Sequence, residues 1–338
     1  MSNAILSRLE RVYMALQGSG SQTDFQTVAT LGNSNYVRHI KMTAKNDINL
    51  LVRRDKTGAR TATQGVRGRG HGVWNFESSL ALSGVNGTAP DFEPLMRSIF
   101  GQAPASANGG LQYSFVDTPI LTFTMASYRQ PSTAMQRIAY GCLADRTVFK
   151  IGEDIAEFTS EGECRFVIDS DYFSAATAEE LGGLSSFPSE PGAPVSHGGI
   201  IAGFTGLISV GGSTIARVRT ATVEINNGAS TIKDTFGTYI PDDTQGDVRT
   251  VTAAFTMYED DSASQQALRV AAVSKTPVDA DLTVGTVAGS IAQFQLKNIL
   301  LASYDLDDSA LRYSLNFPAS RAYGTSITSR DEVKITFK

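Results

Sequence analysis

A basic run between residues 53 and 69 is the clearest candidate for chemistry in this sequence. It reads RRDKTGARTATQGVRGR, and its cations face a single acid, Asp55. The cations are Arg53, Arg54, Lys56, Arg60, Arg67 and Arg69. Guanidinium and ammonium groups of this density bind phosphates or carboxylates. The run therefore predicts a contact with an anionic partner rather than a catalytic role.

Three interpretations of the basic run remain open. It could be a solvated loop, or it could bind nucleic acid, although no aromatic side chains interleave with the arginines to stack on bases. The interpretation we favour is docking on an acidic surface of a neighbouring copy, because a long connection inside a compact domain often carries a contact. Candidate acidic partners lie in a second connection, at Asp234, Asp242, Asp243 and Asp247.

The histidines and paired acids form no catalytic or metal-binding pattern. His39, His71 and His197 each lack a histidine, cysteine or acid at ligand spacing. The acidic pairs at 242–243, 260–261 and 307–308 have turn-like neighbours, and adjacent carboxylates cannot span a glycosidase cleft. We expect no catalytic residue, no metal and no cofactor.

The cysteines and a glycine-rich run also have ordinary explanations. Cys142 and Cys164 lie in strand-like segments outside any CxxC pattern, which predicts buried reduced thiols, with a disulfide as the alternative. The run GGIIAGFTGLISVGG at 198–212 lacks the GK[ST] ending of a phosphate loop. We expect it to be a flexible entry to a second domain.

Composition narrows the class of protein. The 338 residues are 41% hydrophobic and 19% charged, with a net charge of −5, which predicts a packed core and argues against a general nucleic-acid binder. Residues 1–173 carry 17 basic and 16 acidic side chains, whereas residues 174–338 carry 12 and 18. No run of about 18 apolar residues and no signal peptide are found. We therefore expect synthesis in a cytoplasm and no membrane partner.

Hydrophobic periodicity predicts a mainly β protein with short helices. Ile5, Leu9, Val12, Tyr13 and Leu16 have helical spacing and predict an N-terminal helix. Helices are also predicted at 92–100, capped by Asp91 and ended by Gly101, and at 262–273, capped by Ser262. Elsewhere the period is two, as in 74–82, 121–125, 164–168, 251–257, 311–317 and 333–337.

The order of these elements repeats along the chain. A strand near 36–44, a long loop at 45–70, a strand at 71–83 and the helix at 92–100 are matched by a strand near 215–225, a loop at 226–247, a strand at 248–259 and the helix at 262–273. This predicts two tandem β domains, at 1–173 and 199–338. Residues 174–198, with several prolines, serines and glycines, have the composition of a linker.

Several segments resemble the tail tube proteins of long-tailed bacteriophages. They are MSNAILSRLERVY at the start, FEPLMRSIFG at 92–101, QRIAYGCLADRTVFKIGEDIAEFTSEGECRFV at 136–168 and VRTVTAAFTMYED at 248–260. The resemblance spans most of the chain. It implies small β-sandwich or barrel domains, each with a flanking helix.

The resemblance also implies a function in assembly. Tube proteins of this family form rings of six domains around a DNA channel, the rings stack, and long loops bridge them; those loops correspond here to 45–70 and 226–247. Two domains per chain would close the ring with three copies. The implied partners are further copies, the tape measure protein, the tail terminator and DNA passing without specific binding, in the virion tail. The alternative is another ring- or tube-forming virion or injection-system protein, such as a terminator or baseplate hub.

Overall fold

The chain is a mainly β protein, as the sequence predicts. This computed structural model describes residues 9–18, 20–52, 65–130, 134–152, 154–192, 198–215, 218–308 and 311–338. The strands are β1 (Arg11–Gln17), β2 (Tyr36–Val37), β3 (Lys41–Leu51), β4 (Val66–Ser79), β5 (Ala105–Ala107), β6 (Gly110–Tyr113), β7 (Thr122–Tyr128), β8 (Arg137–Cys142), β9 (Arg146–Ile151), β10 (Glu157–Cys164), β11 (Phe166–Asp169), β12 (Gly206–Val210), β13 (Ser213–Ile215), β14 (Val218–Asn226), β15 (Ala229–Ile232), β16 (Asp243–Gly246), β17 (Thr250–Tyr258), β18 (Val278–Val284), β19 (Ala292–Leu300), β20 (Asp305–Asp307), β21 (Ser314–Ala322) and β22 (Val333–Phe337). The helices are α1 (Gln22–Gln26), α2 (Glu93–Phe100) and α3 (Ala263–Ser274), with 3₁₀ turns η2 (Asn33–Asn35) and η3 (Phe173–Ala175).

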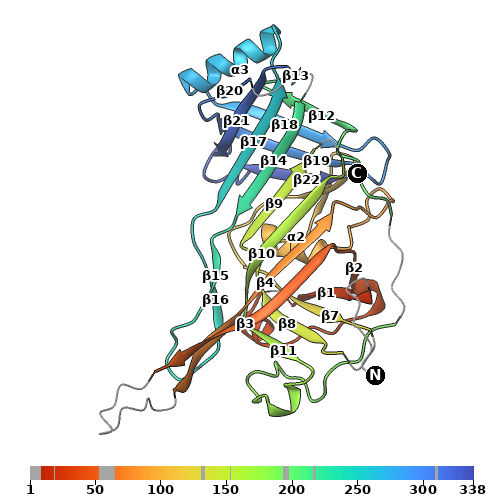
Figure 1. The fold of residues 1–338 in the computed structure, drawn as a ribbon, viewed down its shortest axis with the longest axis vertical. Helices are drawn as coiled ribbons and strands as arrows, with labels where there is room; N and C mark the ends of the chain where they lie inside the picture. Colours follow the sequence, from red (N-terminus) through yellow and green to blue (C-terminus); the bar gives the residue numbers. More distant parts are fainter. Residues whose placement is uncertain are drawn as a thin grey trace.

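One long sheet forms the frame of the molecule. Its strands follow the order β13-β12-β18-β19-β21-β17-β14-β9-β10-β4-β3, and they run the length of the long axis in Figure 1. A smaller sheet, β11-β8-β7-β1-β2, lies at the end of the molecule that holds β3 and β4. A separate hairpin, β15-β16, descends beside the long sheet toward β3 and β4.

The first and second halves of the sequence meet inside this sheet. β9 pairs with β14 over six residue pairs, from Ala221↔Ile151 to Asn226↔Arg146. β22 pairs with β6 of the first half, with Ile335 opposite Tyr113. The core is also continuous, since the rings of Phe149 and Phe294 lie 5.1 Å apart. The division into two domains stays a prediction, and its two sides share one sheet and one core.

The predicted linker and glycine-rich entry are packed. Leu184 and Phe187 cover the buried Tyr13 and Ile138 of the small sheet, and Glu190 accepts a 2.9 Å ion pair from Arg11. The expectation of a flexible entry at 198–212 is wrong, because 206–210 is strand β12, paired with β18. Apolar alternation at Leu207, Ile208 and Val210 outweighs the glycines there.

The predicted N-terminal helix is wrong over its second half. Residues 11–17 form strand β1, which lies between β7 and β2; residues 1–8 lie outside the described part of the chain. Val12, Tyr13, Met14 and Ala15 are all buried. A strand covered on both faces has a continuous apolar run, and such a run also satisfies helical spacing over a short window.

The two other predicted helices are confirmed. α2 begins one residue later than predicted, with Phe92 at its cap, and ends at Gly101 in the left-handed conformation. Asp91 does not cap it, because its carboxylate binds Arg38 at 3.2 Å. α3 begins after Ser262, whose hydroxyl accepts from the Gln265 backbone N–H. Its inner face, including Leu268 and Ala272, packs on the core.

Both predicted long loops are instead built around hairpins. β3 continues to Leu51 and β4 starts at Val66, so most of the described part of 45–70 is strand. Within 226–247, β15 pairs with β16 from Ala229↔Gly246 to Ile232↔Asp243. Glycines at 65, 68, 70 and 72 suggest a loop in the sequence, but the cross-strand ladder accommodates them.

Candidate assembly site

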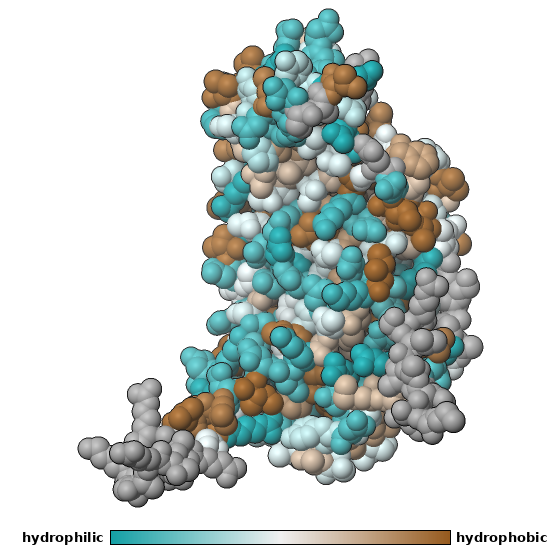
Figure 2. All heavy atoms as spheres, viewed as in Figure 1, coloured by the Kyte–Doolittle hydropathy of each residue, from teal (hydrophilic) through white to brown (hydrophobic). Residues whose placement is uncertain are grey.

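The β3–β4 hairpin leaves the body of the molecule as an arm. We define the arm as residues 47–52 and 65–70, which project from the lower end in Figure 1. Ladder pairs continue along it, with Leu50 opposite Arg67 and Leu51 opposite Val66. Exposed hydrophobic side chains gather on the arm (Figure 2). They are Ile48, Leu50, Leu51, Val52 and Val66, and we call them the arm patch.

The arm patch continues the face of β3 that covers the core. Met42 and Ala44 are buried on this face, and Ile48 and Leu50 follow at the same period. Beyond the body nothing in the described chain covers them, and Leu50 is 67% exposed. The sequence signal is the apolar run INLLV at 48–52. It was missed because the neighbouring charges and glycines indicate a loop.

Arg67 ties the arm to a buried acid. Its guanidinium donates to Glu180 at 2.6 Å and to the Tyr172 hydroxyl at 3.1 Å, and it lies 5.5 Å from the ring centre of Tyr239. The Glu180 side chain is fully buried and also accepts from the backbone N–H of Thr177 at 2.8 Å. Burial would lower the pKa of Arg67, but the bonds to Glu180 and Tyr172 raise it. A guanidinium therefore neutralises the one buried carboxylate at the base of the arm.

The opposite side of the arm base contacts the segment after β15. Arg69 donates to the backbone carbonyls of Lys233 at 3.2 Å and Thr235 at 3.0 Å. The Gly70 N–H donates to the Tyr239 carbonyl at 2.9 Å. Segment 233–239 of the same chain thus braces the arm through backbone groups, which a change of side chain in that segment would leave in place.

A cluster of His71, Glu163 and Lys233 completes this brace. Lys233 donates to Glu163 at 2.5 Å and lies 3.3 Å from the His71 ring nitrogen. Burial would raise the pKa of Glu163, but bonds from Lys233 and Thr231 lower it. Burial, and then the charge of Lys233, lowers the pKa of His71. The cluster joins β4, β10 and the β15–β16 hairpin around one ionised carboxylate.

The predicted basic and acidic sets have different outcomes. Arg53, Arg54, Lys56 and Arg60 lie outside the described residues. Arg67 and Arg69 are described and both bind within their own chain, so docking of this run on another copy stays a prediction.

The four predicted acids also make contacts within the chain or face solvent. Asp242 accepts from the Thr235 hydroxyl at 2.8 Å, and Asp243 and Asp247 each accept from the backbone N–H that follows them. Asp234 is exposed. The structure thus brings Arg69 beside the segment that holds Asp234, although it binds carbonyls there rather than carboxylates.

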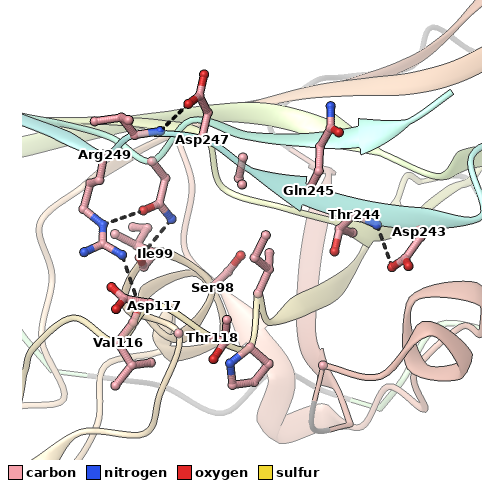
Figure 3. Close-up of a pocket in the computed structure, with 18 of the residues that line it drawn as sticks. Ser98, Ile99, Val116, Asp117, Thr118, Asp243, Thr244, Gln245, Asp247 and Arg249 are labelled. Carbon is pink, nitrogen blue, oxygen red and sulfur yellow. Dashed lines mark hydrogen bonds between the residues drawn. The ribbon is translucent and has the colours of Figure 1, made fainter.

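A cleft of about 690 Å³ lies between α2 and the β15–β16 hairpin (Figure 3). Arg249 is its most prominent charge, and it donates to Asn227 at 3.0 Å and to the Val116 carbonyl at 3.1 Å. Its guanidinium carbon is 3.8 Å from the centre of the Phe115 ring. Burial lowers the pKa of Arg249. Because the guanidinium already binds these groups, the cleft offers no reactive cation.

The remaining candidates for chemistry have structural partners. His39 lies 3.8 Å from Glu10, and His197 is outside the described residues. Cys142 and Cys164 are buried free thiols. In the described ranges no group of three or more histidine, cysteine or acidic residues could hold a metal. Among the same residues no helix has the length and apolarity to cross a membrane.

Comparisons with known proteins are sparse. No protein-family model matches the chain, and no curated protein matches it. Among solved structures, it is similar to a chain in the tail of an empty GTA particle computed with helical refinement and C6 symmetry. The identity is 17% and the TM-score 0.25, over 37% of this chain and 85% of that one. A TM-score this low does not establish a common fold or function.

Proposed function

We propose that this chain is a structural subunit of a phage tail tube, which self-assembles into stacked rings that form the channel for DNA ejection. One observation carries the proposal. The long sheet runs through both halves of the chain, has β13 and β3 as its terminal strands, and extends β3 into an apolar arm outside the body. A monomer gains nothing from such an arm, whereas a polymer can bury it.

Ring closure accounts for the terminal strands. A terminal strand presents unpaired N–H and C=O groups, which invite pairing with another chain. Side-by-side copies that close a ring remove these edges, as a barrel does. Because each half contributes a strand–hairpin–strand–helix series, three copies would supply six similar units. The arm would then reach a neighbouring copy.

The electrostatics fit a channel that DNA passes through without specific binding. The net charge is −5, and the described cations at the arm base bind within the chain. Affinity for DNA depends mainly on cations available to phosphates. The tape measure protein and tail terminator are the partners that the family resemblance implies. The proposed role needs no catalytic residue, metal or cofactor.

Electron microscopy tests this function directly. Negative-stain images of the purified protein at high concentration are expected to show smooth tubes with a central channel. Discrete rings that do not stack would favour a terminator or hub. Monomers at every concentration would refute both.

The segment that joins β3 and β4 gives a second test. Replacement of residues 53–64 by a short Gly-Ser turn keeps both strands of the arm and removes four of the predicted cations. The subunit is expected to fold and to lose tube formation. Unchanged tubes would show that the basic run does not hold copies together.

A further inference from the structure

A second unpartnered apolar surface lies at the other end of the molecule, on the outer face of α3. Val270 and Val273 on this face are 65% and 75% exposed, and Ala263 and Ala267 are exposed beside them. The opposite face of the helix is buried through Leu268, Ala271 and Ala272. We call the exposed residues the helix patch. Amphipathic surface helices normally place polar residues on this side.

The arm patch and the helix patch cannot meet within one chain. Figure 1 places α3 and the arm at opposite ends of the long axis. Their chemistry is nevertheless complementary. The arm patch has long aliphatic side chains, and the helix patch has short ones that leave room for them. Two such surfaces on opposite ends of one chain are what a head-to-tail contact requires.

The charges around the two patches have opposite signs. Asp261 lies directly before the cap of α3 and is exposed. Tyr304 lines a small hollow with Ala272 and Val273, and the exposed Asp305 follows it. The cations Arg269 and Lys275 on the helix bind Glu259 and the Leu301 carbonyl. In the sequence, the connection between the strands of the arm holds Arg53, Arg54, Lys56 and Arg60 against Asp55.

From this arrangement we propose that the arm patch of one copy docks on the helix patch of a second copy. The contact has an apolar centre and a charged rim, the usual anatomy of a protein interface. It deepens the proposed function, because it names the receiving surface on which the arm rests. It also differs from docking on the 234–247 segment, since that segment already braces the arm base of its own chain.

The test uses one charge on each patch. Leu50→Glu and Val270→Glu change side chains that are exposed in the monomer, so both variants are expected to fold. Ile327→Glu, at a residue that is 99% exposed and outside both patches, is the matched control. Burying an unpaired carboxylate is costly, so each patch variant should raise the critical concentration for assembly about tenfold or more, while the control should not.

Mixing the two patch variants gives the decisive readout. L50E keeps an intact helix patch and V270E keeps an intact arm, so one contact can form between them and no further copy can add. Analytical ultracentrifugation is expected to show a one-to-one dimer in the mixture and monomers of each variant alone. A mixture that stays monomeric would overturn the proposal.

The failures of the two proposals are distinguishable. If the unchanged protein never assembles, the tail tube function fails. If it forms tubes and V270E forms them equally well, the function stands and the helix patch is not the receiving surface. A second copy docked as proposed should also form a disulfide between Leu50→Cys on one chain and Val270→Cys on another, under an added thiol oxidant. Cross-linking no greater than between L50C and I327C would refute the contact.

Discussion

Removing the guanidinium of Arg67 should weaken the fold measurably through the acid that it neutralises. In Arg67→Met the Glu180 carboxylate, fully buried, loses a charged donor at 2.6 Å. A hydrogen bond to a charged group contributes about 1.5–3 kcal/mol. The Arg67 side chain is 42% exposed, so solvent screens the pair, and Thr177 still donates to Glu180. We therefore expect a loss of about 1–2 kcal/mol in the free energy of unfolding.

The matched control is Arg69→Met, two residues further along the same strand. It removes the same charge from a side chain that binds only backbone carbonyls in exposed positions. We expect it to cost less than about 1 kcal/mol. The double variant R67M/E180Q should recover part of the R67M loss, because a neutral amide needs no cation. A coupling of about 1 kcal/mol between the two sites would measure that compensation.

The assay is urea unfolding at a concentration too low for assembly. Trp74 is the only tryptophan in the sequence, is buried on β4, the strand that carries Arg67, and donates to the Glu163 carbonyl at 3.0 Å. Its fluorescence should report loss of this region. Equal midpoints for R67M and R69M, or single losses that simply add in R67M/E180Q, would refute the assigned role of Glu180.

Three further predictions follow from other contacts. Gly72→Ala should lower the free energy of unfolding by about 1–3 kcal/mol, because the added methyl overlaps the Cys164 Sγ, and Cys164→Ala should relieve the loss; urea midpoints that do not move would contradict this. Burial would raise the pKa of Glu10, but bonds from His39 and Ser127 and the charge of Arg129 lower it to about 2. Its stabilisation is therefore complete above its ordinary pKa of 4.5 and is lost as the pH falls toward 2, so Glu10→Gln should destabilise the protein more at pH 7 than at pH 3, and equal losses would oppose the assignment. Burial, and then the neighbouring Cys164, raises the pKa of Cys142, so a thiol reagent should modify neither cysteine before urea unfolds the chain, and rapid modification of the native protein would exclude buried thiols.

Sequence periodicity predicted the fold class and the two longer helices because their signals are local. Ser262 and Gly101 have the same role in any context, so α3 begins and α2 ends where expected. The N-terminal segment was misassigned because burial of β1 on both faces depends on β7 and β2, which lie elsewhere in the sequence.

The candidate site was only partly predictable. The charges of Arg67 and Arg69 are visible in the sequence, but their partners Glu180 and Lys233 are more than a hundred residues away. The arm was predicted as a loop because Gly68 and Gly70 disfavour strands in isolation. In the structure, the ladder to β3 accommodates them.

The pairing of β9 with β14 and of β6 with β22 bears on how the chain would respond to proteolysis. Each pair joins the two sides of the 174–198 segment by backbone hydrogen bonds inside one hydrophobic core. A protease that cuts within this segment would therefore produce two fragments that migrate as one particle until a denaturant separates them. The halves are separate stretches of sequence, but they behave as a single cooperative body.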